Sequence, residues 1–528
     1  MSRARTLVSR GPAVLALFLV VTVLVLSPTR SRAAEVTTAT PLAVALHTLS
    51  PATIPEKGKV VLAGTVRNDS AETWSAINVH PFISNAPITD RDQLATAAAS
   101  DPATEICCRL TGLGQFAALG DLQPGQSAPF RIELKAKDLR AEISGAPGVY
   151  WIGVHALGQN AQGRDQVADG RARSFIPLVD PNAHTSVSLV IPVRERVRRD
   201  KAGRLTDTAD WSQALSDDGR LERIAALLDS ARARTATMLI DPAVIDAVAS
   251  ITADNPALSL GEGPAPGASE TPTGTPGETP SGAPGDLSSP SRDLDRLGPD
   301  DRSNATRWLA QLNSAAGLQT VLGLGYADPD TAALARRRPA YLGLAAKQSA
   351  TAFERLGISA VPTVAPPTGW LDDQALASID KDTMVLVSDQ AAPRTRTHWR
   401  TPEGQDLVFT DAQAASGGPG PTAPLDALAI RQRILSDAAL RAQAGQSSPM
   451  VVELPADWDP GPQWQDAQFF TGLDQPWLHL ESLDRSPEET TPSFDAALGY
   501  TASERRDEIG LANISAARGL IGTADLMG

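Results

Sequence analysis

The feature that most constrains the fold is a regular alternation of apolar strands and amphipathic helices from Val187 to Leu483. Such alternation is typical of a parallel sheet with helices on its outside. About eight strands in roughly 300 residues suit a (β/α) barrel, irregular or incomplete in places. An open, doubly wound sheet is the competing fold. The predicted strands are Val187–Val193, Thr235–Ile240, Gln319–Tyr326, Ser359–Ala365, Thr383–Ser388, Asp406–Thr410, Met450–Leu454 and Leu478–Leu483.

The stretches between these strands repeat apolar residues at helical spacing, and the whole pattern predicts a barrel domain over residues 185–500. The predicted helices are Leu221–Leu228, Ala305–Leu312, Leu342–Leu356, Leu425–Ala442 and Pro462–Leu473.

Two segments fall outside this rhythm. Residues 256–291 are dominated by Pro, Gly, Ser, Thr and Glu, so they cannot bury enough surface to offset their ordering entropy. We expect a disordered insertion within the barrel domain, with a true interdomain linker as the alternative. Residues 501–528 form a C-terminal segment in which Ser503–Leu526 is expected to be helical. This helix either packs on the barrel or belongs to a chain truncated at its C-terminus.

The region before the barrel, residues 36–180, is predicted to be an immunoglobulin-like β-sandwich. Phe130, Ile132 and Leu134 alternate with charged residues, which is the period-2 pattern of a half-buried strand. Several short strands separated by polar turns indicate an antiparallel sandwich. Residues 102–120 are expected to form a long inserted loop. The other predicted strands are Lys59–Val66, Ala76–Ile83, Val149–Leu157 and Ala172–Val179.

The N-terminus has the organisation of a secretory signal peptide over residues 1–33. Arg3, Arg5 and Arg10 precede an apolar run, residues 13–26, and small residues follow it. Cleavage is expected after Ala33, which leaves the mature chain outside the cytoplasmic membrane. The run is shorter than the ~20 residues that span a bilayer comfortably. Retention as an uncleaved anchor is the alternative.

The formal net charge of −14 argues against binding nucleic acid or an anionic lipid surface by charge alone. The two cysteines, Cys107 and Cys108, are adjacent, so no disulfide can join distant parts of the chain. Three interpretations of this pair stay open. It forms a redox or metal site, a local bridge within the loop, or two thiols packed as small hydrophobic side chains.

Carboxylates recur at or just beyond the C-terminal ends of the predicted barrel strands, which line the functional face of such barrels. Paired carboxylates there could hydrolyse a glycosidic bond, one donating a proton and the other attacking or activating water. The candidate catalytic residues are Glu453 with Asp389 or Asp411, and Asp241 and Asp328 are candidate ligand-binding residues. The structural alternative is helix capping, because Asp241-Pro242, Asp328-Pro329 and Asp372-Asp373 each precede a helical run. The strand-end carboxylates are Asp241, Asp328, Asp389, Asp411, Glu453 and Glu481.

Tryptophans follow the same strand ends. Trp370 and Trp458 are candidate platforms for sugar rings, as is Trp464, although packing in the core or at the rim is the alternative. No histidine pair has the i, i+4 spacing of a metal-binding helix, and there is no CxxC cluster. No metal site and no cofactor are therefore predicted.

Several motifs together resemble an uncharacterised family of large actinobacterial envelope proteins often encoded beside the lipid II flippase. In the sandwich they are Leu122-Gln-Pro-Gly before Phe130-Arg-Ile-Glu-Leu, and the segment 148–155. In the barrel they are the segments 237–242 and 451–455. The resemblance implies a barrel similar to those of glycoside hydrolases and polysaccharide deacetylases. It also implies that further β-rich sequence and a C-terminal membrane span follow residue 528 in members of the family.

Two functions are compatible with these patterns. The first is a cell-envelope protein that binds glycan or partner proteins without catalysis, through the sandwich and a degenerate barrel. The second is a carbohydrate hydrolase that uses the paired carboxylates. A scaffold for export of peptidoglycan precursors is a third. Cell-wall glycan or envelope proteins are the expected partners, and a membrane is contacted through an uncleaved signal or a missing C-terminal anchor.

Overall fold

The chain from Thr40 onward forms one compact unit. The predicted signal peptide, and all but the first two residues of the predicted insertion 256–291, lie outside the described residues. The computed structural model describes residues 40–257, 297–392, 396–420, 423–484 and 491–516.

The first part of the chain builds two antiparallel sheets, called the antiparallel region below. A three-stranded sheet has the order β1-β2-β5, and a four-stranded sheet has the order β4-β3-β6-β7. In β2, Val60, Leu62 and Val66 are buried while their neighbours are more exposed, as a pleated strand requires. Apolar residues from both sheets belong to one core cluster. The strands are β1 (Leu42–Ser50), β2 (Lys59–Asn68), β3 (Trp74–Ile83), β4 (Ala117–Leu122), β5 (Ser127–Lys135), β6 (Gly148–Gln159) and β7 (Gly170–Leu178).

The strands predicted for this region are confirmed, but a purely β structure is wrong. Two helices interrupt it, α1 (Arg91–Ala98) and α2 (Ala136–Glu142). Helix α1 begins where it does because the Asp90 side chain accepts a hydrogen bond from the Gln93 backbone N–H (2.8 Å). The end of the predicted loop 102–120 is also wrong, since β4 begins inside it. An immunoglobulin-like topology for this region stays a prediction.

The rest of the chain, called the parallel region, is built on one nine-stranded sheet. All of the predicted barrel strands are confirmed, and the short antiparallel edge strand β13 was not anticipated. The strands are β8 (Thr185–Val193), β9 (Thr237–Ile240), β10 (Thr320–Leu324), β11 (Val361–Val364), β12 (Met384–Ser388), β13 (His398–Arg400), β14 (Asp406–Thr410), β15 (Met450–Glu453) and β16 (Leu478–Leu480).

The sheet is curled into a partial barrel. From β8 to β12 and on to β14, each strand pairs in parallel with its neighbour in chain order, and β15 then returns to pair with β8. The Asp411 backbone N–H donates to Val451 O (2.7 Å), so the end of β14 meets β15. A doubly wound sheet needs its strand order to reverse in the middle. That alternative is therefore wrong.

Alternate residues of the parallel strands form a separate apolar cluster, which identifies the interior of the curled sheet. Their neighbours along each strand face outward and pack against the helices or in the main core. The interior residues are Val190, Leu239, Leu322, Leu324, Ala365, Met384, Leu386, Val408, Val451 and Leu483.

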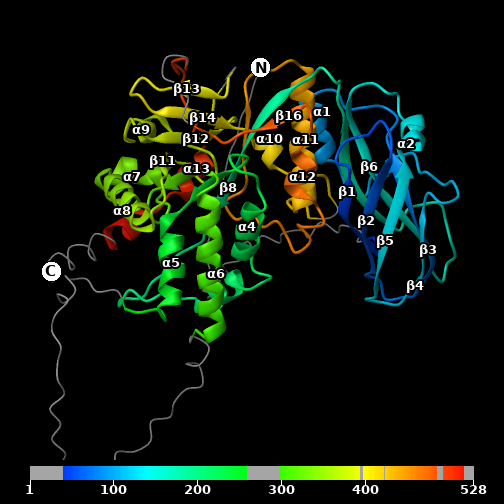
Figure 1. Cartoon of the computed structure of the whole chain (residues 1–528), viewed down its shortest axis with the longest axis horizontal. Helices are drawn as coiled ribbons and strands as arrows, with labels where there is room; N and C mark the ends of the chain where they lie inside the picture. Colours follow the sequence, from blue (N-terminus) through cyan, green and yellow to red (C-terminus); the bar gives the residue numbers. More distant parts are fainter. Residues whose placement is uncertain (1–39, 258–296, 393–395, 421–422, 485–490, 517–528) are drawn as a thin grey trace, which may run out of the picture. The chain divides into compact units, whose positions relative to one another are not determined.

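Helix α11 lies between the two regions, in contact with β8 on one side and with β1, β6 and β7 on the other (Figure 1). It is buried nearly all round, and its polar residues bond to the antiparallel region: Gln432 donates to Ala52 O (3.0 Å) and Phe175 O (2.7 Å). The helices of the parallel region are α3 (Thr208–Leu215), α4 (Arg220–Asp229), α5 (Pro242–Thr252), α6 (Pro299–Ala316), α7 (Thr331–Arg337), α8 (Ala340–Leu356), α9 (Asp373–Leu376), α10 (Ala412–Ala415), α11 (Ala427–Gln443), α12 (Phe469–Leu473) and α13 (Ala502–Asp507).

Two predicted helices are corrected. In Pro462–Leu473 the α-helix begins at Phe469, after a series of turns. In Ser503–Leu526 the helix ends at Asp507, and residues 511–516 form a separate helical turn beyond Gly510. The chain leaves the helix between Asp507 and Gly510, where arginines of α7 bind the Glu508 carboxylate and the Ile509 carbonyl. Residues 517–526 lie outside the described part of the chain.

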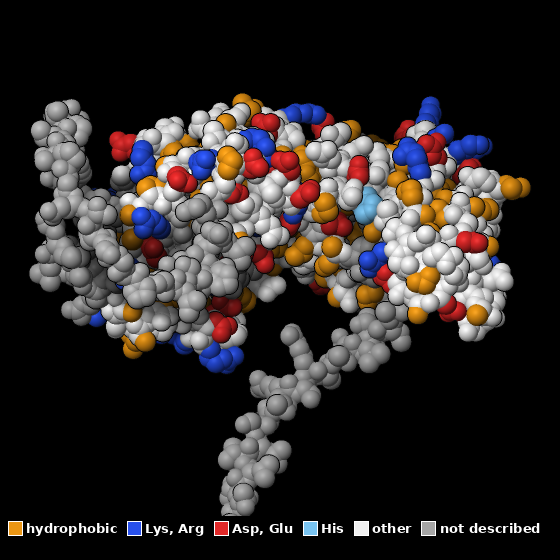
Figure 2. Space-filling view, turned by 90° about the horizontal axis from the view of Figure 1, so that it is seen from below, with side chains coloured by type: hydrophobic (Ala, Val, Ile, Leu, Met, Phe, Trp, Pro, Cys, Tyr) orange, Lys and Arg blue, Asp and Glu red, His pale blue; other side chains and the backbone are white. Residues whose placement is uncertain are grey.

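On the face shown in Figure 2, Lys and Arg side chains are interspersed with Asp and Glu, and apolar side chains lie between them. Among the described helices, none combines the length and the apolar character needed to cross a membrane.

Candidate functional site at the mouth of the curled sheet

Four charged side chains gather where the parallel strands end. Arg194 directly follows β8, Asp241 follows β9, Asp328 lies in the loop after β10, and Glu453 is the last residue of β15. Arg194 Nε lies 3.4 Å from Asp328 Oδ2, and Arg194 Nη1 lies 3.9 Å from Glu453 Oε1. We call these residues the Arg194 cluster. It occupies the C-terminal end of the sheet, where (β/α) barrels carry their active sites.

The pleat of the strands places three of these side chains in the interior. Side chains two residues apart on a strand share one face. Asp241 comes two residues after Leu239, and Glu453 two residues after Val451, both of which belong to the interior cluster. Arg194 likewise lies four residues after the interior residue Val190. The strand backbone therefore directs the side chains of Arg194, Asp241 and Glu453 into the interior of the curled sheet. Asp328 joins them from the loop after β10.

The Arg194 guanidinium is buried, with 6% of the residue exposed, and only part of it is hydrogen-bonded. Its Nη2 donates to Ala365 O. Its Nε and Nη1 make no hydrogen bond with any described residue, and their carboxylate neighbours lie beyond the ~2.7–2.9 Å of a charge-assisted bond. A buried donor without a partner costs about 1–3 kcal/mol. Two donor atoms of a buried cation are thus left without a hydrogen-bond partner among the described residues.

Asp241 holds the loop that carries Asp328. Its Oδ1 accepts from Ala243 N–H (2.9 Å) at the start of α5 and from Ala327 N–H (3.0 Å) in the next loop. Ala327 (φ +62°) and Asp328 (φ +42°) are both left-handed, a conformation that costs a non-glycine residue of order 1 kcal/mol or more. The predicted cap at Asp241 is confirmed. The Asp241 side chain also positions the loop after β10, because the same oxygen that caps α5 accepts a hydrogen bond from the Ala327 backbone N–H.

The predicted cap at Asp328 is wrong. Helix α7 begins at Thr331, and the Asp330 side chain caps it by accepting from Ala333 N–H (2.9 Å). The left-handed backbone at Asp328 prevents the helix from starting at Pro329. The Asp328 carboxylate is therefore directed to Arg194 instead.

Burial raises the pKa values of all three carboxyl groups. For Glu453 it raises the pKa to about 7, against the opposing effect of Arg194. For Asp241 it raises the pKa to about 7, although the Ala243 N–H bond favours the ionised form. The pKa of Asp328 is also raised by burial and is lowered again by Arg194. At neutral pH the cluster therefore holds carboxyl groups that can either give or take a proton.

Asp411, another candidate catalytic residue, is held by contacts within the chain, and a catalytic role for it stays a prediction. Both of its carboxylate oxygens accept from Arg91 Nη2, which reaches it from helix α1 of the antiparallel region (2.6 and 2.7 Å). Its Oδ1 also caps α10 by accepting from Ala414 N–H (3.0 Å). Asp389 Oδ1 accepts from Ala412 N–H (3.3 Å) near the same helix start, and a catalytic role for it stays a prediction.

The three tryptophans that were candidate sugar platforms lie in different surroundings. Trp458 is buried, and its Nε1 donates to Leu425 O (2.8 Å), so it packs in the core and cannot stack on a sugar. Trp464 packs against the main core cluster, and Trp370 packs against the cluster outside β12 and β14. A ligand-binding role for Trp370 stays a prediction.

Arg194, the residue at the centre of the cluster, was not among the residues predicted from sequence. The signal was present, because the period-2 rule that selects Asp241 and Glu453 applies equally to the residue after Val193. The predicted site consisted of carboxylates and tryptophans and therefore lacked the cation that lies between the carboxylates.

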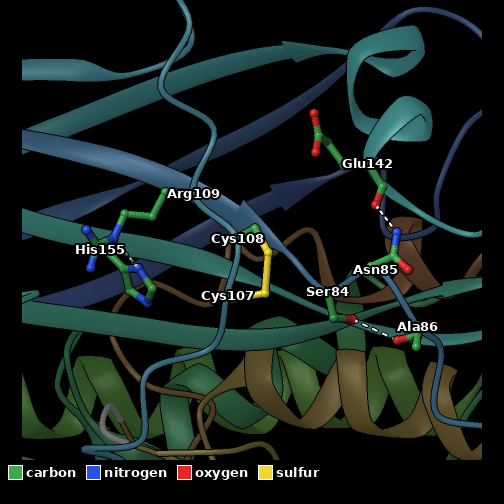
Figure 3. Close-up of a disulfide and its surroundings, with 8 residues drawn as sticks. All are labelled: Ser84, Asn85, Ala86, Cys107, Cys108, Arg109, Glu142 and His155. Atoms are coloured by element: carbon green, nitrogen blue, oxygen red, sulfur yellow. Dashed lines mark hydrogen bonds between the residues drawn. A yellow bond between two sulfur atoms is a disulfide. The ribbon is translucent and has the colours of Figure 1, made fainter.

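The cysteine pair forms the local bridge. Cys107 and Cys108 are joined by a disulfide in an exposed loop of the antiparallel region (Figure 3), so neither sulfur is available to a metal in this state. The next residue, Arg109, donates from Nε to His155 Nδ1 (3.0 Å). Burial, reinforced by Arg109, lowers the pKa of His155 to about 3, so this histidine is neutral.

No family model and no curated protein sequence matches the chain. Similar solved structures include an α-amylase from Thermotoga maritima (TM-score 0.35, 9% identity, covering 61% of this chain and 78% of that one). They also include a GH57-type branching enzyme from Pyrococcus horikoshii (TM-score 0.34, 9% identity, 60% and 72%). A β-glucosidase from Thermotoga neapolitana matches with a TM-score of 0.16 and 14% identity, over 26% of this chain and 16% of that one. At these scores the likenesses carry no argument about function.

Proposed function

We propose that the chain is a carbohydrate-active hydrolase and that the Arg194 cluster is its site. The observation that carries the proposal is a buried guanidinium with two unbonded donors, placed between carboxyl groups at the mouth of a curled parallel sheet. A sugar supplies hydroxyl and ring oxygens that such donors can bind. The carboxyl groups supply the proton chemistry that cleavage of a glycosidic bond requires.

The pKa values suggest a division of roles. Glu453, with a pKa of about 7, is partly protonated at neutral pH and donates its proton to the leaving glycosidic oxygen as the carbon–oxygen bond breaks. Asp328, beside Arg194, accepts a proton from the water whose oxygen bonds to the anomeric carbon. The proton lost by Glu453 is thereby balanced by the proton gained by Asp328. Arg194 orients the substrate, and Asp241 holds the loop of Asp328.

One observation favours a second function, glycan binding without catalysis. Arg194 is in ion-pair range of both Glu453 and Asp328, and the Glu453 side chain is only 11% exposed. If a ligand leaves these contacts in place, the cluster recognises a glycan and does not cleave it. Both functions place the glycan at the Arg194 cluster. They differ in whether the bound glycan is cleaved.

The test uses the full chain and a panel of soluble α- and β-linked oligosaccharides together with purified cell-wall glycan. We expect Glu453→Gln to lower kcat by about 10²–10⁴-fold on a substrate that the wild type cleaves. The wild-type rate should fall as the pH rises through about 7, because the acid form of Glu453 is lost. Glu481→Gln is the matched control, because β16 pairs with the start of β8 (Leu480 with Val187), so Glu481 lies away from the mouth.

Binding without product in both proteins would support the second function. Equal turnover by the wild type and Glu453→Gln would contradict the proposed role of Glu453. If no member of the panel binds, both the catalytic and the non-catalytic function are contradicted, because each requires a glycan to bind at the Arg194 cluster.

We also propose that the chain acts outside the cytoplasmic membrane, as a cell-envelope protein of the family that it resembles. The basic start, apolar run and small residues before Ala34 support export. The Cys107–Cys108 disulfide supports it too, because disulfides persist mainly in oxidising compartments. An N-terminal sequence starting at Ala34 in protein recovered from outside the cell is the expected result, and recovery only from cytosol would contradict it.

A further inference from the structure

A groove of about 650 Å³ lies along the outer side of the curled sheet, and Asp328 of the Arg194 cluster lines one end of it. One wall is helix α8, the floor is β11 with the end of β10, and the other wall is residues 378–383 before β12. Small and apolar side chains predominate along it, among them Ala346, Ala350, Phe353, Ala360 and Pro362. Phe353 packs tightly on the floor because residue 323 is glycine, where a Cβ would come within 2.6 Å of its ring.

The groove occupies the position of a missing helix. In a (β/α) barrel each strand is followed by a helix that covers the outside of the sheet. The connection from β11 to β12 contains the four-residue α9, and α9 packs with α7 over the outer residues of β12. The outer face of β11 is left open, and Pro362 in the middle of this strand is exposed. The sheet therefore presents a groove with a largely apolar floor at the position where a barrel would have a helix.

One end of the groove carries acidic side chains without ion-pair partners, whereas Asp328 at the opposite end is paired with Arg194. Glu354 near the end of α8, and Asp380 and Asp382 before β12, are exposed and make no ion pair within the described chain. Lys381 is the basic residue among them. These residues lie at the end of the groove where β11 and β12 begin, because α8 leads into β11 and residues 380–382 lead into β12.

We propose that this groove binds an amphipathic helix of a partner protein, with Ala and Leu on its buried face and Lys or Arg in its last turn. A helix in the missing position runs antiparallel to β11, from the C-terminal end of the strand to its N-terminal end. Its C-terminus then meets the acidic end of the groove. The partial negative charge of a helix C-terminus is unfavourable beside Glu354, Asp380 and Asp382, so the last turn of the partner has to be basic.

The probe is a synthetic peptide of about 16 residues, long enough to form helix on its own. It has Ala and Leu at i, i+3, i+4 and i+7 and three lysines in the last turn. A permuted peptide has the same composition with the lysines in the first turn. Fluorescence anisotropy with the full chain should show micromolar binding of the first peptide and about tenfold weaker binding of the permuted one.

Three variants locate the binding. Ala350→Arg places a charge in the groove and should weaken binding at least about tenfold. Asp380→Asn with Asp382→Asn should remove the preference between the two peptides and reduce the dependence of binding on salt. Thr351→Arg is the matched control, because Thr351 is exposed on α8 but does not line the groove. It should bind like the wild type.

The proposal fails if the wild type binds neither peptide, if Ala350→Arg binds as well as Thr351→Arg, or if both peptides bind equally to the wild type. Circular dichroism of each variant confirms that its fold is retained. Residue 350 is exposed, so an arginine there displaces no core side chain, and the two Asp→Asn changes remove no buried group.

Discussion

Two arginines of this molecule each face two carboxylates near the ends of the parallel strands, and they do so in different ways. Arg91 bonds Asp411 through Nη2 (2.6 Å) and Asp437 through Nε (2.8 Å). Arg194 lies 3.4 and 3.9 Å from Asp328 and Glu453, with no hydrogen bond to either. The first group is a closed ion-pair network, and the second leaves its donors open.

The difference separates structural from chemical use of the same residue types. Burial alone would lower the pKa of Arg91, yet Asp411 and Asp437 raise it, so the charged form is strongly stabilised. In the Arg194 cluster the effect of burial exceeds that of the nearby arginine, and the pKa of Glu453 is raised to about 7. Charges that satisfy one another join two regions of the chain. Charged groups that lack hydrogen bonds to one another, as in the Arg194 cluster, can bind a ligand or transfer a proton.

The largest expected effect comes from opening the closed network. Arg91→Met removes the cation and leaves Asp411 buried without its partner, so the free energy of unfolding should fall by about 3–5 kcal/mol at pH 7. The measurement is urea unfolding of the full chain. Because Arg91 belongs to α1 of the antiparallel region, loss of this pair also removes a link between the two regions.

Arg194→Met is the matched change in the open cluster. It should cost less at pH 6 than Arg91→Met, since Glu453 and Asp241 can take up protons when their pKa values are about 7. Equal losses for the two variants at this pH would break the distinction between the closed and the open group.

A smaller effect is expected from Glu453→Gln. The folded-state pKa of Glu453 is raised, so the folded chain binds a proton more tightly than the unfolded chain. Stability is therefore lost as the pH rises from about 4.5 to about 7, and Gln removes this loss. The variant should be more stable than the wild type by up to ~3 kcal/mol at pH 8, and close to it at pH 5.

Thermal unfolding at both pH values measures this difference, and Glu481→Gln should show none of it. The opposite trend, with the variant gaining at pH 5 and losing at pH 8, would mean that Glu453 is ionised and stabilised by Arg194. The cluster would then be a second closed ion pair.

Much of the parallel region could be predicted from sequence because its signal is local. Strand–helix alternation predicted every described strand of the parallel region except β13. The prediction for Asp406–Thr410 matched β14 at both ends. In the antiparallel region, helix α1 was missed although Asp90 and Gln93 have the spacing of a capping box. No secondary structure was predicted for residues 84–101, where this helix lies.

The site was harder to predict because its geometry depends on long-range contacts. The strand-end rule located Glu453, Asp241 and Asp328 at one mouth, but it could not choose between them and Asp411. That choice depends on Arg91, which is 320 residues away in the sequence and belongs to a different region. Local propensity also failed at Asp328, where two left-handed residues displace the helix start.

The smallest effect concerns the support of the open cluster. Asp241→Ala removes the bonds to Ala243 and Ala327 and should cost about 1–2 kcal/mol at pH 5.5, where the raised pKa keeps the wild-type group mostly protonated. Asp90→Ala, which removes the cap of α1, should cost about 1 kcal/mol. Asp241→Asn should cost less, because its amide oxygen can still accept both bonds.

Ligand binding distinguishes the two cap variants. Asp241→Ala releases the left-handed turn at Ala327 and so displaces Asp328 from Arg194, whereas Asp90→Ala leaves that loop unchanged. We therefore expect weaker binding or slower turnover with Asp241→Ala, recovery with Asp241→Asn, and wild-type behaviour with Asp90→Ala. If Asp241→Ala binds and turns over like the wild type, the position of Asp328 does not depend on Asp241. The open geometry would then have to be maintained by Arg194 alone.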